Sequence, residues 1–193
     1  MGFENVKIGY GFTGSFCTLD KSFAAMERLV SLGADVTPIM SDAVYTTSTR
    51  FGEAEHFIKR AEEICNRAVM HKVTQTELIG PKNLLDIMII APCTSNTIGK
   101  LANGINDTPV TMAAKATIRN ARPVLIAVST NDGLWASAKN IGILMNYKNY
   151  FLVPFEQDDP IKKPHSLVAD FERMTEAVAA SLRHEQLRPL FVE

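Results

Sequence analysis

Residues 85–91, which read Leu-Asp-Ile-Met-Ile-Ile-Ala, form a nearly uniform apolar run that limits the possible folds more than any other part of the chain. A strand that is apolar on both faces must be covered on both sides, which is typical of a parallel strand in an α/β protein. Residues 124–128 have the same character. We therefore expect a sheet whose central strands lie between two layers of helices.

Other segments show the spacing of amphipathic helices, with apolar residues three or four positions apart. These segments are residues 16–30, 53–71, 95–101, 111–120 and 167–183. Shorter apolar segments predict further strands at residues 6–8, 34–40 and 151–154. Because strands alternate with helices, the sequence predicts the α/β class: a doubly wound parallel sheet in a Rossmann-like three-layer sandwich. With 193 residues and no repeat or linker, we expect a single domain over residues 1–193.

The charge balance and the cysteines exclude several classes of protein. Lys and Arg number 20 and Asp and Glu number 21, a net charge of −1, so we expect no nucleic-acid partner and no membrane partner. No apolar run approaches the roughly 18 residues of a membrane span. Cys17, Cys65 and Cys93 are too widely spaced for a disulfide framework or a zinc site. We expect a cytoplasmic protein with reduced thiols and no metal.

In a doubly wound sheet, ligands bind where the carboxyl ends of the strands meet, so the residues after each strand form the candidate site. Gly9, Gly11 and Gly14 match the pattern G-x-G-x-x-G, in which glycines let the backbone approach a phosphate. After the second strand, Ser41 precedes Asp42, whereas a dinucleotide site favours an acidic residue first. The segment fits a flavin mononucleotide at least as well as NAD, and a tight turn without a ligand stays open.

Four small polar residues in a row follow the run at residues 85–91. Thr94, Ser95, Asn96 and Thr97 stand where the next helix is expected to begin. A helix N-cap needs only one such side chain, so the others indicate hydrogen bonds to a ligand.

The segment 91–97, Ala-Pro-Cys-Thr-Ser-Asn-Thr, is followed by Gly-Lys-Leu-Ala-Asn-Gly-Ile at residues 99–105. These motifs resemble the signature of the homo-oligomeric flavin-containing cysteine decarboxylases, a flavoprotein family that includes phosphopantothenoylcysteine decarboxylase and the lantibiotic peptide decarboxylases. The resemblance extends over nearly the whole chain. It implies an FMN cofactor and a homo-oligomer, either a trimer or a trimer-based dodecamer. The segment 131–146 is apolar enough to form the interface of such an oligomer.

The resemblance also assigns a cofactor site where the motifs match. The FMN phosphate would lie at the turn after the first strand, and the flavin ring near the turn after the third. The implied FMN-binding residues are Thr13, Gly14, Ser15, Phe16, Ser41, Thr94, Ser95, Asn96, Thr97 and Ala127, with Val128 as an alternative to Ala127. Asn131 would bind the substrate.

Two departures from the family pattern change the expected reaction. The decarboxylases carry a catalytic His about eight residues before the Asp that precedes the third strand, and here Leu78 stands at that position before Asp86. His71 lies too far from Asp86 along the chain. A second family motif, Pro-x-Met-Asn-x-x-Met-Trp, keeps only Asn131 and Trp135. We therefore expect no decarboxylation of cysteinyl substrates, and the catalytic residues stay unassigned.

A closer likeness within the family is carried by residues 9–17, 128–135 and 139–146. It implies one component of an oxidoreductase that oxidises a dihydro- or tetrahydropyridine dicarboxylate during sporulation, in the cytoplasm of the mother cell. A partner protein would carry the NAD(P) site. Two alternatives stay open: a non-catalytic flavin-binding component that stabilises its partner, and a cysteine decarboxylase with a displaced base.

Other reactive side chains have simpler explanations. Cys93 is either a nucleophile or a small space-filling residue, and we favour the second because a reactive thiol needs electropositive neighbours. The four histidines lack the spacing of metal ligands. A group of cations is either solvated or a clamp for the carboxylates of a dianionic substrate. These cations are Lys162, Lys163, His165, Arg119 and Arg122.

Overall fold

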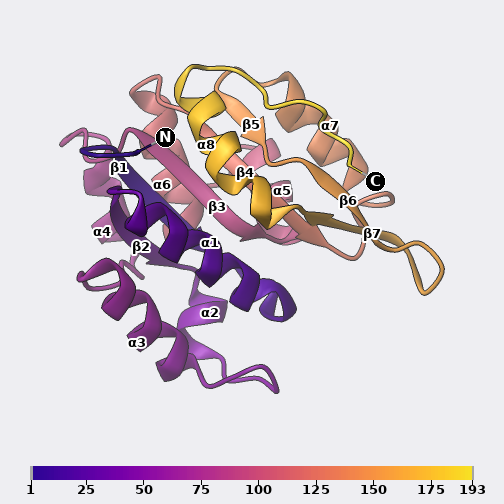
Figure 1. The fold of residues 1–193 in the computed structure, drawn as a ribbon, viewed down its shortest axis with the longest axis horizontal. Helices are drawn as coiled ribbons and strands as arrows, with labels where there is room; N and C mark the ends of the chain where they lie inside the picture. The colour runs from indigo at the N-terminus through magenta and orange to yellow at the C-terminus, as the bar shows by residue number, and fades with distance from the viewer. Residues whose placement is uncertain (1, 193) are drawn as a thin grey trace.

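The computed structural model describes residues 2–192, which form a seven-stranded sheet with helices on both faces (Figure 1). The strands are β1 (Lys7–Phe12), β2 (Asp35–Met40), β3 (Ile87–Cys93), β4 (Val124–Thr130), β5 (Tyr150–Leu152), β6 (Phe155–Asp159) and β7 (Lys163–Ala169). Their order is β2-β1-β3-β4-β7-β6, and β5 also pairs with β4. Strands β1 to β5 are parallel, whereas β7 is antiparallel to β4 and β6.

Two layers of helices cover this sheet. The helices are α1 (Leu19–Ser31), α2 (Asp42–Thr46), α3 (Ala54–Cys65), α4 (Val73–Thr76), α5 (Ser95–Ala102), α6 (Pro109–Arg119), α7 (Ala138–Asn146) and α8 (Met174–Leu182). Short 3₁₀ turns are η1 (Phe16–Thr18), η2 (Glu77–Ile79) and η3 (Phe171–Arg173). Residues of α1, α3 and α8 join one apolar core, and residues of α5, α6 and α7 join the other, on opposite faces of the sheet (Figure 1).

Strand β3 lies at the centre of this sandwich, and all of its residues are buried. From Ile87 to Ala91 its side chains alternate between the two cores, because successive residues of a strand point to opposite faces. Ile87, Ile89 and Ala91 join the core under α1, and Met88 and Ile90 join the core under α6. A register shift between Ile90 and Cys93 then places Cys93 in the core under α6 as well. The expected α/β class with a doubly wound, three-layer arrangement is confirmed. No helix within residues 2–192 is both long enough and apolar enough to cross a membrane.

The glycines of the first strand have a different role from the one expected. Gly9 and Gly11 lie inside β1 and not in the turn after it. A Cβ atom at Gly9 would lie 2.5 Å from Leu85 Cδ1, and one at Gly11 would lie 2.7 Å from Met88 Cε. These glycines therefore make room for neighbouring core side chains, and the G-x-G-x-x-G interpretation is wrong for both of them.

The last third of the chain differs most from expectation. The helix expected over residues 167–183 is wrong at its start, because Leu167 to Ala169 belong to β7, and α8 begins only at Met174. Strands β6 and β7 form an antiparallel hairpin that projects from the body of the molecule (Figure 1). Helix α7 was not expected either. The apolar residues of β7 are too few to distinguish the period of a strand from that of a helix.

A buried hydrogen-bond chain attaches α1 to the sheet beside the carboxyl end of β3. Ser22 Oγ donates to the carbonyl oxygen of Ala91 at 2.6 Å, and the Tyr10 hydroxyl donates to the carbonyl oxygen of Ser22 at 2.9 Å. Burial raises the pKa of Tyr10 well above its usual value, so this hydroxyl stays neutral and remains a donor. The chain of hydrogen bonds holds the segment that leads from β3 into the expected cofactor motif.

We predict that Ser22→Ala lowers the free energy of unfolding by about 1–3 kcal/mol, because the buried carbonyl of Ala91 loses its side-chain donor. Urea denaturation measures the change. Ser31→Ala is the matched control: the exposed Ser31 hydroxyl donates to the carbonyl of Arg28 near the end of the same helix. We expect it to stay within about 0.5 kcal/mol of the parent protein. Equal destabilisation by both substitutions would contradict the role given to Ser22.

Candidate functional site

The loops that follow β1 and β3 are fastened together by one threonine. Thr13 Oγ1 donates to the carbonyl oxygen of Pro92 at 2.8 Å and accepts a hydrogen bond from the backbone N–H of Thr94 at 3.0 Å. Thr13 is buried. Its hydroxyl therefore satisfies two backbone groups where the parallel strands end, and it sets the position of the segment 94–97 relative to Gly14.

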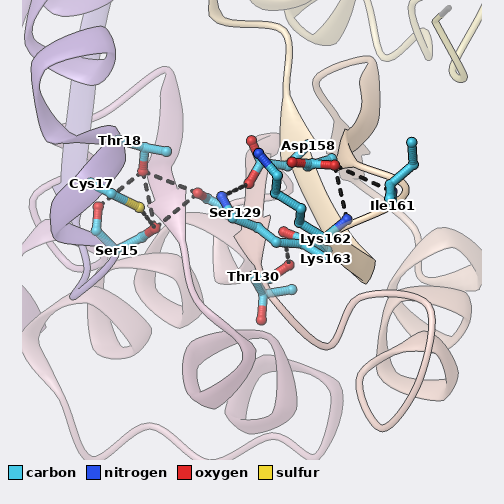
Figure 2. A network of polar contacts seen from close by, with 11 residues as sticks. Ser15, Cys17, Thr18, Ser129, Thr130, Asp158, Ile161, Lys162 and Lys163 are labelled. Carbon is cyan, nitrogen blue, oxygen red and sulfur yellow. Dashed lines mark hydrogen bonds and ion pairs between the residues drawn. The ribbon is translucent and has the colours of Figure 1, made fainter.

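A cluster of three hydroxyls joins the end of β4 to the turn after β1. Ser15 Oγ lies 2.9 Å from Ser129 Oγ, and Thr18 Oγ1 lies 3.0 Å from both of these atoms. Figure 2 shows the three hydroxyls turned toward one another. Thr18 and Ser129 were not expected from the sequence. Ser129 follows the apolar run 124–128 and could have been found by the argument used for Thr94, whereas Thr18 carries no signal of its own.

These loops border a cleft of about 770 Å³ at the carboxyl edge of the sheet. Its volume is within the range of small-molecule and cofactor pockets, roughly 300–1,000 Å³. The cleft is lined by Gly14, Ser15, Phe16, Cys17, Thr18, Lys21, Arg50, Phe51, Thr94, Ser95, Ser129, Thr130, Asn131, Asp158, Lys163, Ser166, Leu167 and Val168. The structure thus brings six of the expected site residues to one cavity: Gly14, Ser15, Phe16, Thr94, Ser95 and Asn131.

The other expected site residues do not line the cleft. Thr13, Thr97 and Ala127 are buried, and Thr13 acts through its contacts with the loop after β3. Asn96 is exposed at the start of α5. Ser41 is half-buried at the start of α2.

Ser41 carries a buried hydroxyl without a partner. Its backbone N–H donates to the carbonyl oxygen of Phe12 at 3.0 Å, which holds the residue at the carboxyl edge of β1 and β2. Its Oγ is the single buried side-chain nitrogen or oxygen atom without a hydrogen bond within the described part of the chain. An unsatisfied buried hydroxyl costs about 1–3 kcal/mol, which makes Ser41 Oγ a candidate contact for a bound group.

Three cations and one carboxylate line the cleft. Lys21 comes from α1, Arg50 from the loop after α2, and Lys163 from the β6–β7 hairpin, where it forms an ion pair with Asp158 (Figure 2). The hydrogen bond to Asp158 raises the pKa of Lys163. The excess of positive charge favours an anionic ligand.

The cations expected at a carboxylate clamp therefore separate into two groups. Lys163 lines the cleft. Arg122 forms an ion pair with Asp86, 3.4 Å between Nη1 and Oδ1, and precedes β4. Because β4 and β3 are parallel, that pair lies at the amino edge of the sheet and far from the cleft. Arg122 is therefore not part of this clamp, and Arg119 does not line the cleft.

Among residues 2–192, no histidine lines the cleft, and the residues that the family pattern assigns to catalysis and substrate binding do not form a catalytic group there. Leu78 lies in η2 and is exposed. His71 stacks on Tyr45 with ring centroids 3.8 Å apart and an interplanar angle of 6°. Trp135, from the second motif, is 73% exposed. In the same described range, no group of three or more His, Cys, Asp or Glu residues is placed to hold a metal ion.

Comparison with known proteins gives a consistent picture. The model of the flavoprotein family matches residues 3–182. The B subunit of dipicolinate synthase from Bacillus subtilis (strain 168) is 46% identical over 187 residues, which cover 97% of this chain and 94% of that protein. The B subunit of the same enzyme from Bacillus halodurans C has a crystal structure with a TM-score of 0.92 at 44% identity, covering 100% of this chain and 99% of that one.

A more distant structure shares the fold alone. The FMN-dependent cysteine decarboxylase SpaF has a TM-score of 0.68 at 18% sequence identity, and the match covers 94% of this chain and 98% of that one.

We predict that iodoacetamide at mildly alkaline pH alkylates Cys17 in the folded protein and leaves Cys65 and Cys93 unmodified. Cys17 is exposed, whereas burial raises the pKa of Cys65 to about 12 and that of Cys93 still further. Because the thiolate is the reactive form, buried thiols with raised pKa values react slowly. Peptide mass spectrometry measures the labelling, and unfolding in guanidinium chloride should expose all three. Labelling of Cys93 as fast as Cys17 would instead make Cys93 a candidate nucleophile.

Proposed function

We propose that this chain, which belongs to the flavoprotein family, is the B subunit of a dipicolinate synthase. It would bind FMN and take part in oxidising a dihydro- or tetrahydropyridine dicarboxylate to dipicolinate. The A subunit of dipicolinate synthase would be its partner and would carry the NAD(P) site. The observation that carries the proposal is the 46% identity to the Bacillus subtilis protein over 97% of this chain.

The residues at the carboxyl edge fit FMN. Ser41 Oγ is a buried hydroxyl without a partner among the described residues, as a ligand site requires. The backbone N–H groups of Gly14 and Phe16 donate no hydrogen bond to any residue in 2–192, so they are free for a phosphate. Thr94 and Ser95 provide hydroxyls that line the same cleft. Bound FMN would supply two-electron redox chemistry at this edge.

The remaining proposed cofactor residues act less directly. Thr13 holds the Thr94 backbone in place. Asn96 and Thr97 lie in the first turn of α5, where backbone N–H groups have no partner within the helix. Ala127 is fully buried in β4 and supports the floor of the site through its backbone.

The charges of the cleft suit a dicarboxylate substrate. Arg50 and Lys21 are cations that form no ion pair with any residue in 2–192, and they can each bind one carboxylate. The amide of Asn131 lines the same cavity and can orient the substrate by donating to a carboxylate. These residues bind and orient, and the group that accepts or donates the substrate proton stays unassigned.

We also propose that the chain forms a homo-oligomer, a trimer or a trimer-based dodecamer, in the mother-cell cytoplasm of a sporulating bacterium. Exposed apolar side chains around α7 support an interface there, since Trp135 is 73% exposed and Ile143 is 36% exposed. The alternative of a stabilising role without catalysis is favoured by one observation: within the described residues, no histidine, the side chain most often used as a general acid or base, lines the cleft.

We predict that FMN binds the purified protein and that Gly14→Asp weakens this binding at least tenfold. The new carboxylate would face the phosphate, and repulsion between like charges a few ångströms apart is worth about 1–4 kcal/mol. Flavin fluorescence quenching measures the affinity. Gly14→Ala is the matched control: its Cβ would lie 3.6 Å from Ala43 Cβ, an ordinary contact, so binding should be retained. Undiminished binding by Gly14→Asp would exclude this placement of the phosphate.

We predict that the A-subunit partner and this chain together form dipicolinate, and that Arg50→Gln raises the KM for the dicarboxylate about tenfold or more, because a charge-assisted hydrogen bond is lost. FMN affinity should not change. Lys82→Gln removes the same charge outside the cleft and should leave KM unchanged. Product formation by ultraviolet absorption gives the rates.

Two results would contradict this assignment. If cleft variants of this chain leave turnover by the partner unchanged while the complex still forms, the chain only stabilises its partner. If the flavin-loaded protein releases carbon dioxide from phosphopantothenoylcysteine or from a peptide ending in cysteine, the chain is a cysteine decarboxylase despite Leu78.

A further inference from the structure

A second cavity lies at the opposite edge of the sheet from the cleft. It has a volume of about 630 Å³, and we name it the amino-edge pocket. It is lined by Ala121, Met145, Tyr147, Lys148, Asn149, Tyr150, Phe151, His184, Gln186, Arg188 and Leu190. These residues come from the turn before β4, the end of α7 and the loop after it, β5 itself and the C-terminal segment after α8, which passes β5 (Figure 1).

The amino-edge pocket is separate from the proposed flavin site. It adjoins the start of β4, where the backbone N–H of Val124 donates to the carbonyl oxygen of Asn149 at 2.8 Å. The cleft adjoins the other end of β4, at Ser129 and Thr130. At about 3.3 Å per residue, these two ends of the strand lie roughly 20 Å apart. The two cavities share no lining residue.

The charge of the amino-edge pocket is positive. Lys148 and Arg188 are both lining residues, and neither forms an ion pair with any residue from 2 to 192. His184 adds a third basic side chain, and no Asp or Glu among the described residues lines the cavity. In a chain with a net charge of −1, such an uncompensated group favours an anion.

Aromatic rings form much of the remaining wall. Tyr147 and Tyr150 have ring centroids 6.1 Å apart at an interplanar angle of 51°. Phe151 and His184 meet edge to face, with centroids 6.4 Å apart. Burial raises the pKa of Tyr150 to about 12, so its hydroxyl stays a neutral donor. Rings placed around a cavity offer faces and edges on which a planar ligand can stack.

Hydrogen bonds fix the C-terminal segment against β5 and the loop before it. The side-chain amide of Gln186 binds both backbone groups of Leu152: its Oε1 accepts from the N–H at 2.9 Å, and its Nε2 donates to the carbonyl oxygen at 2.7 Å. His184 Nδ1 lies 3.1 Å from Asn149 Oδ1. Ala121 and His184 follow the C-caps of α6 and α8 and have the left-handed backbone that is common where helices end, with φ angles of 56° and 60°.

We propose that the amino-edge pocket binds a planar aromatic anion, a ring that carries a carboxylate or a phosphate group. The ring would stack on Tyr147 and Tyr150, and the anionic group would lie between Lys148 and Arg188. An aromatic dicarboxylate and a purine nucleotide share this chemistry. Binding at this pocket is independent of the proposed function, because none of its residues belongs to the cleft.

Isothermal titration calorimetry tests the proposal with two probes, pyridine-2,6-dicarboxylate and adenosine monophosphate. We expect at least one of them to bind, and Lys148→Gln combined with Arg188→Gln to weaken that binding about tenfold or more. Lys82→Gln combined with Lys115→Gln removes the same charge from exposed residues outside both cavities and should leave binding unchanged. Whichever probe binds shows whether the pocket takes an aromatic carboxylate or a nucleotide. Cyclohexane-1,3-dicarboxylate, which has the charges without an aromatic ring, should bind more weakly than the pyridine compound.

A second measurement locates the ligand in the unaltered protein. Methyl resonances of labelled methionines should show a shift at Met145, which lines the pocket, and none at Met26, which is buried in the core under α1. The proposal is overturned if neither aromatic probe binds, or if Met145 does not respond. It is equally overturned if the Lys148 and Arg188 double variant binds as tightly as the parent protein, since the ligand would then lie in the cleft.

Discussion

The burial of β3 on both faces is the constraint on which the rest of the structure depends. A strand that is covered on both sides requires two helical layers, and the crossovers between them keep β1, β2, β3 and β4 parallel. Parallel strands end at a common edge, where the connecting loops have backbone groups that need partners. Thr13 supplies two of those partners at once, to Pro92 and Thr94. The shape of the cleft is therefore a consequence of how the core is covered.

The residues that line the cleft are of two kinds: hydroxyls fixed to the core strands, and cations on exposed segments. The hydroxyls of Ser15, Thr18 and Ser129 are attached to the ends of core strands and to each other, so they form a fixed layer. The cations Arg50 and Lys163 come from exposed segments outside that layer. Binding groups on loops can change without disturbing the core that supports them. This separation explains how a chain can keep the cofactor motif of the cysteine decarboxylases while Leu78 and the second motif depart from their pattern.

The sequence predicted the structure correctly where a residue pattern has one physical cause. It was misleading where two different structural roles select the same residue type. The apolar runs at 85–91 and 124–128 are short and rich in β-branched residues, which favours buried strands, and the structure has β3 and β4 there. Glycine serves both a phosphate turn and close packing, so Gly9 and Gly11 could not be assigned from spacing alone. The clustering of Ser95 with Gly14 followed from strand order, but the missing partner of Ser41 Oγ depends on tertiary contacts that no local pattern carries. For the same reason, Lys163 and Arg122 looked equivalent although they lie at opposite edges.

The cleft and the amino-edge pocket differ in whether any of their cations forms an ion pair. Whether binding in one can affect the other depends on the strand that connects them. Lys163 in the cleft is paired with Asp158, whereas Lys148 and Arg188 in the amino-edge pocket have no such partner within residues 2–192. The direct connection between them is β4, which is buried from Val124 to Ser129 and packed on both faces. Coupling between distant sites needs an element with two discrete arrangements. A close-packed central strand resists small displacements, so a ligand at the amino edge would be bound by its own charges and rings while the geometry of Ser129 and Thr18 stays the same.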